Sequence, residues 1–240
     1  MKGTCKLCGT TETFLRKSHI IPRALYGDLS DEDPRGPLKL VPFDPKERAV
    51  TSRIGVYDRI LCEACEKIMS DFDDYAIRVL RDMEPSETLH HKDGTIEGYL
   101  FAGVNLELLL LYSISLVWRA HTSEHNFFKS VQLGPHEANC RKAILERNID
   151  RASGVDAIFG RFDDPRANGF INPYQEHQYG VRLYRFSAAQ LTHGIKVDNR
   201  PFGNPLRHCS IRNTNNLIVL ARVFKDSPEF RFMQKTLKGR

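Results

Sequence analysis

The sequence lacks an apolar leader-like segment, internal repeats and low-complexity stretches. Met1-Lys2-Gly3-Thr4-Cys5 contains no apolar run of the kind that directs secretion, so we expect a cytoplasmic protein whose cysteines stay reduced. The absence of repeats and biased tracts argues against a solenoid or a disordered segment. With 240 residues, of which 41% are hydrophobic and 27% charged, the chain has the composition of a globular protein of one or two domains.

No apolar stretch stays free of polar residues over the length that a membrane helix needs. The most apolar segment runs from Tyr99 to Trp118, and about twenty residues would suffice to cross a bilayer. Asn105 and Glu107 interrupt it, which would cost several kcal/mol in lipid. We therefore predict no membrane span, and instead a buried core helix over this segment that ends at Trp118-Arg119 and packs beneath the cysteine-containing region.

Isolated cysteines are also scarce, because four of the six cysteines form two Cys-x-x-Cys pairs. The pairs are Cys5 with Cys8 and Cys62 with Cys65. Such a pair places two thiolates on one tight turn, and two pairs complete a tetrahedral four-sulfur site. We predict that these four residues bind a structural zinc ion. The alternative is that they are unrelated thiols whose spacing is a coincidence.

The second cysteine pair opens a stretch with helical periodicity. Apolar residues recur there at three- and four-residue steps, which predicts a helix from Cys62 to about Glu84, before Pro85. β-Branched and aromatic runs predict strands elsewhere. The other predicted elements are a strand or hairpin arm over residues 13–21, a loop-like insertion over 27–59, a helix over 135–148, strands over 155–159, 179–186 and 217–224, and turns at Asn168-Gly169 and Asp198-Asn199.

These elements predict an α+β protein in three parts. A zinc-stapled module covers residues 1–84, a helical part covers 85–150, and a strand-rich, basic part covers 151–240. Residues 1–120 contain 16 Lys and Arg against 19 Asp and Glu, which leaves 19 and 11 of the totals of 35 and 30 for residues 121–240. A basic half suggests a polyanionic partner such as nucleic acid, although a solvated surface would have the same composition.

The order of the motifs resembles the HNH endonucleases. Cys5-Lys6-Leu7-Cys8 is followed by Ser18-His19-Ile20-Ile21-Pro22 and then by Leu61-Cys62-Glu63-Ala64-Cys65-Glu66. The arrangement is most similar to the subgroup whose ββα-metal, treble-clef-type fold is stapled by a four-cysteine zinc. In that subgroup the pattern is Asp-His-Ile-x-Pro, and later Leu-Cys-x-x-Cys-Asn or -His. The resemblance covers roughly residues 5–80.

The resemblance implies a role for His19. It matches the family's general base, which takes a proton from the water that attacks a phosphodiester phosphorus. A catalytic Mg²⁺ or Mn²⁺ would stabilise the leaving oxyanion, and the cysteine-bound zinc would only hold the two arms in register. The nearby Arg16, Lys17 and Arg23 are candidates for contacting nucleic acid. Without the resemblance, the favoured interpretation of His19 is a further residue near the zinc or a strand histidine that is hydrogen-bonded to backbone.

The sequence departs from the family pattern at the expected ligands of the catalytic metal. Ser18 stands where the family has Asp or His, and Glu66 stands where it has Asn or His. A Glu66 carboxylate would suit a hard cation, although it could also complement the dipole of a helix N-terminus. Asp58 lies near the family's loop-bracing Asn. Asp73 and Asp74 follow on the predicted helix and could compensate for Ser18.

Other histidines and arginines carry weaker signals. His90 and His91 lie in a polar loop and are expected to be solvated. His121 and His125 are four residues apart, but no glutamate completes a His-Glu-x-x-His pattern, so we interpret them as the end of a helix. Five arginines of the strand-rich part could line a phosphate-binding face, although alternate residues along a strand point to opposite sides. They are Arg182, Arg185, Arg207, Arg212 and Arg222.

The sequence thus predicts a metal-dependent, HNH-type endonuclease that acts on DNA rather than RNA. Two alternatives stay open. One is a catalytically degenerate module that binds nucleic acid or a protein partner, for which Ser18 is the strongest argument. The other is a structural zinc in a subunit that binds a partner or a second copy of itself. Residues beyond about 150 match no motif that would choose among them.

Overall fold

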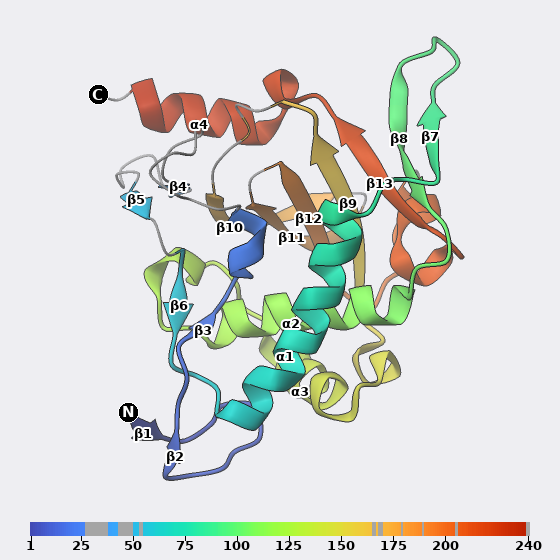
Figure 1. The fold of residues 1–240 in the computed structure, drawn as a ribbon. Coiled ribbons are helices and arrows are strands. Elements are labelled where there is room, and N and C mark those ends of the chain that lie inside the picture. Colours follow the sequence, from blue (N-terminus) through green and yellow to red (C-terminus); the bar gives the residue numbers. More distant parts are fainter. Residues whose placement is uncertain are drawn as a thin grey trace.

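A large mixed sheet and the helices packed against it form the protein (Figure 1). The computed structural model describes residues 1–26, 38–42, 50–52, 55–164, 167, 170–178, 180–188, 190–204 and 206–238. Most of the predicted insertion over 27–59 and the turn at Asn168-Gly169 lie outside the described residues. The α+β class expected from the sequence is confirmed.

The sheet has nine strands, and its centre is an antiparallel meander. The order is β5-β4-β10-β11-β12-β9-β13-β8-β7. Neighbouring strands among β10, β11, β12 and β9 run antiparallel, whereas β13 is parallel to β9 and β4 is parallel to β10. The bounds are β4 Leu38–Val41, β5 Val50–Ser52, β7 Glu87–His90, β8 Ile96–Phe101, β9 Val155–Phe162, β10 Phe170–Gln178, β11 Val181–Ala188, β12 Leu191–Val197 and β13 Leu217–Arg222.

Helix α2 (Leu106–Thr122) is the core helix, and every residue from Leu109 to Ala120 is buried. Such a helix must be enclosed on all sides because it is apolar around its whole circumference. One side of α2 packs on strands β9 and β12, and the other sides pack on α1 (Glu63–Ile77) and α3 (Glu137–Glu146) (Figure 1). The main hydrophobic core extends from Cys5 to Val219, so all three sequence segments contribute to it.

The prediction of one helix from Tyr99 to Trp118 is wrong in its first part. Residues up to Phe101 belong to strand β8, and the chain turns at Gly103, which has a positive φ of 69°. The helix then begins after Asn105, whose side chain accepts a hydrogen bond from the Leu108 amide at 3.0 Å. The polar residue that interrupts the apolar run is therefore the N-cap of α2. Among the described residues, no helix is long and apolar enough to cross a membrane.

Several other predicted elements are confirmed with shifted ends. The helix at the second cysteine pair is α1, which continues as a π-helical turn over Arg78–Asp82. The predicted helix over 135–148 is α3, and the three predicted strands are β9, β11 and β13. The single strand predicted over 13–21 is instead divided into β2 (Thr13–Phe14) and β3 (Ser18–His19). Strands β10 and β12 and the C-terminal helix α4 (Pro228–Lys238) were not predicted from the sequence.

A buried ion pair joins α2 to α1. The Arg119 guanidinium donates to both carboxylate oxygens of Asp73, at 2.7 and 2.8 Å, and to the carbonyl of His19 at 3.0 Å. The Arg119 side chain is only 2% exposed and that of Asp73 only 14%. Burial raises the pKa of Asp73 and outweighs the lowering by Arg119, whereas the charge of Asp73 overcomes burial and raises the pKa of Arg119. We take both groups as charged, because the two-pronged geometry requires a carboxylate.

Replacing Arg119 with Met should destabilise the protein strongly. The substitution leaves the Asp73 carboxylate buried without its counter-charge, which costs roughly 3–5 kcal/mol. Urea unfolding should therefore show a larger loss for Arg119→Met than for the double variant Arg119→Met/Asp73→Leu. Arg151→Met, which breaks the exposed pair with Glu146, is the control and should cost no more than about 1 kcal/mol. Equal losses in Arg119→Met and Arg151→Met would mean that the buried pair matters no more than a surface pair.

A second buried polar contact lies between α2 and the sheet. The hydroxyl of Tyr112 is 3.1 Å from Nε2 of His193 on β12, and the His193 ring packs edge-on against Phe159 on β9. Burial lowers the pKa of His193 from 6.5 to about 4, although an interaction with the Phe186 backbone opposes the shift. His193 is therefore neutral in the folded protein over the physiological range.

The protein should consequently lose stability in acid through His193. The unfolded chain binds a proton near pH 6.5 and the folded chain only near pH 4, so the free energy of unfolding falls as the pH drops across that window. The loss attributable to this residue is about 3 kcal/mol. Urea unfolding at pH 7.5 and pH 4 should show a smaller pH effect in His193→Phe than in the wild type. The control His208→Asn, which replaces an exposed histidine, should keep the wild-type pH dependence.

Candidate metal centre and the neighbouring histidine

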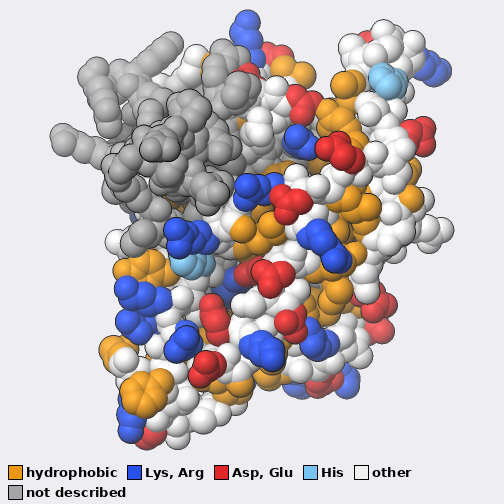
Figure 2. Space-filling model, viewed as in Figure 1, with side chains coloured by type: hydrophobic (Ala, Val, Ile, Leu, Met, Phe, Trp, Pro, Cys, Tyr) orange, Lys and Arg blue, Asp and Glu red, His pale blue; other side chains and the backbone are white. Residues whose placement is uncertain are grey.

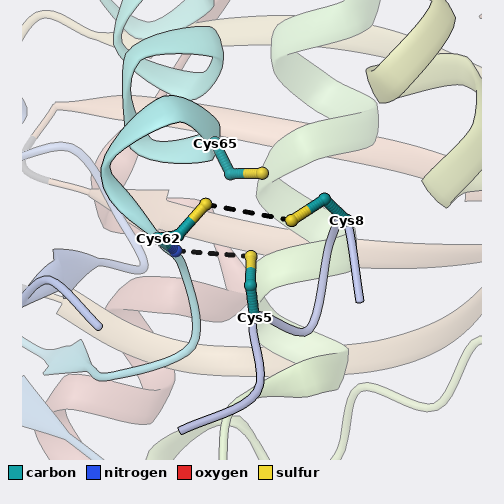
Figure 3. Close-up of side chains that lie close together, drawn as sticks. All are labelled: Cys5, Cys8, Cys62 and Cys65. Atoms are coloured by element: carbon teal, nitrogen blue, oxygen red, sulfur yellow. Dashed lines mark hydrogen bonds between the residues drawn. The ribbon is translucent and has the colours of Figure 1, made fainter. Parts of the chain in front are cut away.

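The four paired cysteines come together at the start of α1 (Figure 3). Cys5 and Cys8 lie in the loop after strand β1 (Lys2–Gly3), Cys62 immediately precedes α1, and Cys65 lies in its first turn. All four sulfur atoms lie within 4.8 Å of one another, and those of Cys8 and Cys62 are 3.8 Å apart. Sulfur atoms at the corners of a tetrahedral zinc site are about 3.8 Å apart when each Zn–S bond is 2.3 Å. The group could therefore hold a metal ion such as zinc.

Backbone hydrogen bonds fix the two cysteine-bearing turns against each other. The amide of Lys6 donates to the carbonyl of Ile60 at 2.8 Å, and the amide of Cys62 donates to the Cys5 sulfur at 3.3 Å. Gly9 closes the first turn with a positive φ of 80°, which glycine adopts without strain, and its amide donates to the Cys5 carbonyl at 2.9 Å. The geometry is thus set by the chain itself as well as by the thiols.

The pKa values of the clustered thiols shift in different directions. Burial and contacts with the other sulfurs raise the pKa values of Cys5 and Cys65. Burial also opposes ionisation of Cys8, but hydrogen bonds with Thr10 lower the pKa of Cys8 to about 6. Four sulfurs in so small a volume cannot all become thiolates unless a cation compensates their charge. A bound metal ion does this, because coordination deprotonates thiols.

Strand β3, which carries His19, meets α1 close to this cluster. It pairs antiparallel with β6 (Tyr57–Asp58), so that Ser18 lies opposite Asp58 and His19 opposite Tyr57. The half-buried His19 ring meets the Tyr57 ring edge-on at 6.2 Å, and the Lys17 ammonium lies 5.0 Å from the centre of the same ring. Helix α1 follows β6 through the second cysteine pair. Two short strands and a helix therefore surround the histidine.

The structure brings together the two expected ligands of a catalytic metal. The buried hydroxyl of Ser18 donates a hydrogen bond to Oε2 of Glu66 in the first turn of α1. Asp73 does not compensate for Ser18, because Arg119 engages both of its oxygens. The Asp58 carboxylate accepts hydrogen bonds from Ser123 and Glu124, at 3.0 and 2.9 Å. It therefore braces the end of α2 against β6.

The three residues predicted to contact nucleic acid lie on the surface of the protein. Arg16, Lys17 and Arg23 are all exposed, and the amide of Arg16 is held by the Leu61 carbonyl at 2.8 Å. Figure 2 shows that Lys and Arg side chains are interspersed with Asp and Glu across the face it presents. The basic residues around His19 are thus local features and not part of one uniformly positive face.

The weaker sequence candidates have structural partners instead of a common site. His121 lies against the Val131 carbonyl, and His125 caps a short helix by accepting from the Phe127 amide at 3.1 Å. His90 and His91 are exposed, as expected. The five strand-region arginines bind different backbone and side-chain oxygens within the fold and do not form one phosphate-binding face. Their partners include Val197 for Arg182, Glu176 for Arg185, Asn213 for Arg207, Val155 for Arg212 and Glu229 for Arg222.

The role of Arg119 was not predicted from the sequence. This residue supports the backbone of His19 directly and orders Asp73 beside Glu66. A signal was present, because a lone arginine within an apolar helix needs a buried acidic partner. Within the part of the chain that the structure describes, the four cysteines are the only group of three or more potential ligand residues close enough to share one ion.

Comparisons with models of known protein families, with curated proteins and with solved structures found no match to this chain. The resemblance to HNH endonucleases therefore rests on the sequence motifs alone.

Purified protein should contain about one zinc ion per chain, held by the four sulfurs. Metal analysis by mass spectrometry should show that Cys62→Ser loses this ion, because three thiolates and a hydroxyl make a weaker site. Cys140→Ala is the matched control, since Cys140 is buried in α3 and is not one of the four clustered cysteines, and it should keep its zinc. Zinc-free wild-type protein, or full zinc content in Cys62→Ser, would contradict the assignment.

Proposed function

We propose that the protein is a metal-dependent endonuclease of the HNH type, with His19 as general base and a structural zinc on the four cysteines. The observation that carries the proposal is the hydrogen bond between Ser18 and Glu66 beside His19. It brings together, from a strand and a helix 48 residues apart in the sequence, the two positions that the resemblance assigns to the catalytic metal.

His19 and the residues around it would each have a separate role in the reaction. The imidazole of His19 would accept a proton from the attacking water, a role that requires a side chain that can be neutral near pH 7. Arg119 holds the His19 carbonyl, and Tyr57 borders the ring, so the imidazole has a defined direction. Exposed Arg16, Lys17 and Arg23 would contact phosphates along a nucleic-acid strand.

Glu66 and Ser18 would hold a divalent cation. The hydrogen bond from Ser18 uses Oε2 of Glu66, so Oε1 is the oxygen that a cation would take. Oxygen ligands suit Mg²⁺ or Mn²⁺, and such an ion, when bound, supplies stabilisation of negative charge on the leaving oxygen. The four-sulfur site has no open position for substrate once zinc is bound, so zinc would serve structure only.

A second candidate is a catalytically inactive module of the same type that binds nucleic acid or a protein partner. It is favoured by the replacement of an acidic ligand by Ser18 and by the engagement of Asp73 with Arg119. Glu66 would then serve the fold alone, by accepting the hydrogen bond from Ser18 and by complementing the N-terminus of α1 with its charge.

A plasmid-nicking assay with Mg²⁺ or Mn²⁺ tests the proposal. Loss of a general base lowers the rate by roughly 10²–10⁴-fold, so His19→Ala should nick supercoiled DNA at least about a hundredfold more slowly than the wild type. The zinc content and far-ultraviolet circular dichroism should be unchanged. His90→Ala, which removes an exposed histidine on edge strand β7, is the control and should cleave normally.

DNA-binding measurements on the wild type and the His19→Ala variant distinguish the second candidate function from the first. DNA affinity that weakens with salt, survives His19→Ala and falls when Arg16, Lys17 and Arg23 are replaced together by Ala would indicate a binding module without catalysis. Absence of both cleavage and salt-dependent DNA binding would instead contradict a nucleic-acid function and favour a protein partner.

A further inference from the structure

A cavity of about 370 Å³ lies on the face of the sheet that α2 does not cover. Strands β9, β12 and β13 form its floor, and β8, β11 and the short helix over Leu206–Cys209 form its sides. The register puts Thr192 opposite Gly160 and Gly160 opposite Leu220, so these three residues share one face. This cavity is independent of the cysteine cluster and of the proposed nuclease site.

Two glycines on this face let neighbouring side chains pack closely over the strands. A Cβ at Gly160 would lie 2.7 Å from Oγ1 of Thr192 and 2.8 Å from Cδ of Arg222. A Cβ at Gly194 would lie 2.8 Å from Cγ1 of Ile158. Neither glycine has a positive φ among the described residues, so backbone geometry does not require them. Their absence of a side chain makes room for these neighbours, of which Thr192, Arg222 and Ile158 line the cavity.

The cavity contains a buried hydroxyl without a partner. Thr192 is 1% exposed, and its Oγ1 makes no hydrogen bond in the structure. A buried hydroxyl left unpaired costs free energy, so the arrangement is explained if a ligand that borders the cavity accepts its proton.

The Arg185 guanidinium borders the same cavity. Arg185 is only 9% exposed; its Nε and Nη2 bind Glu176, and Nη2 also binds Gln178. Its Nη1 extends over the floor, 3.4 Å from where a Cβ of Gly194 would be. Nη1 and the Thr192 hydroxyl are both donors, so the group they would bind together is an acceptor with two oxygens.

Part of the remaining wall is apolar. Ile158, Leu206 and Leu220 line the cavity together with Cys209, whose thiol already donates to the Leu206 carbonyl at 3.1 Å. Burial raises the pKa of Cys209 to about 11, so it contributes a neutral surface. The polar part of the lining is completed by His91, Glu97, Gln178, His208 and Arg222. A cavity with both apolar and polar walls has the character of a small-molecule site.

We propose that this cavity binds a small organic anion, with a carboxylate or phosphate group at Thr192 and Arg185 and an apolar body against Ile158, Leu206 and Leu220. The volume is within the range of small-molecule sites, and it has room for a ligand of about twelve non-hydrogen atoms.

Isothermal titration calorimetry of the whole protein with four probes tests this site. The probes are 4-phenylbutanoate, phenyl phosphate, 4-phenylbutan-1-ol and 4-phenylbutan-1-amine, which separate carboxylate, phosphate, neutral and cationic head groups. Both anions, or one of them, should bind one-to-one with a Kd of about 2 mM or tighter, the value expected for twelve atoms of ordinary efficiency. Which anion binds more tightly identifies the preferred head group.

Thr192→Val keeps the shape of the side chain and removes only the hydroxyl. It should weaken anion binding about tenfold, as expected for a lost hydrogen bond to a charged group, and should leave the melting temperature unchanged or higher. Thr13→Val, on β2 in the cysteine-containing module, should bind like the wild type. Gly160→Ala should also weaken binding, because the added Cβ would displace the Thr192 hydroxyl and the Arg222 side chain. Binding of the alcohol or the amine as tightly as the anions, unchanged affinity in Thr192→Val, or no saturable binding of any probe would overturn the proposal.

Discussion

The guanidinium of Arg119 makes the contacts on which the histidine-bearing part of the molecule depends. It extends from a helix that is otherwise enclosed by apolar side chains, and it binds α1 through Asp73 and β3 through the His19 carbonyl. A buried charge of this kind is tolerated only when its partners are fixed. The relative position of strand and helix is therefore specified at this point, and Ser18 and Glu66 meet within the same arrangement.

The four-sulfur cluster constrains α1 at its N-terminal end. It joins the loop after β1 to the first turn of α1, while Arg119 joins α1 to β3 further along the helix. Between these two constraints, His19 lies on a strand of two residues that would have little stability alone. This explains how so short a strand can hold a histidine in a defined place. It also means that loss of metal and loss of the ion pair should affect the histidine by different routes.

The two faces of the large sheet have different characters. One face is closed by α2, and the buried His193 on that face contacts Tyr112 and the ring of Phe159. The other face carries paired charges, two glycines and the unpaired Thr192 hydroxyl around a cavity. Apolar packing on one side thus provides stability, whereas the second side contains a cavity. Arg185 and Arg222 on this second face are engaged in internal ion pairs, with Glu176 and Glu229 respectively.

Features that depend on local spacing could be predicted from the sequence. The cysteine pairs predicted their own cluster, because two ligands on one turn need no knowledge of the rest of the chain. The periodicity after Cys62 predicted α1, and the β-branched runs predicted β9 and β13. Strand β12 was missed because Gly194 and His193 weaken its pattern, and β10 was missed because Pro173 and polar residues do.

Relations between distant residues became visible only in the folded chain. Asn105 caps α2 because the preceding residues join the sheet as β8, and Arg119 supports His19 because α2 packs against α1 and β3. Thr192, Arg185 and Gly160 border one cavity because strand register places them together. Packing and register bring together residues that are far apart in the sequence, so no local pattern could have predicted these contacts.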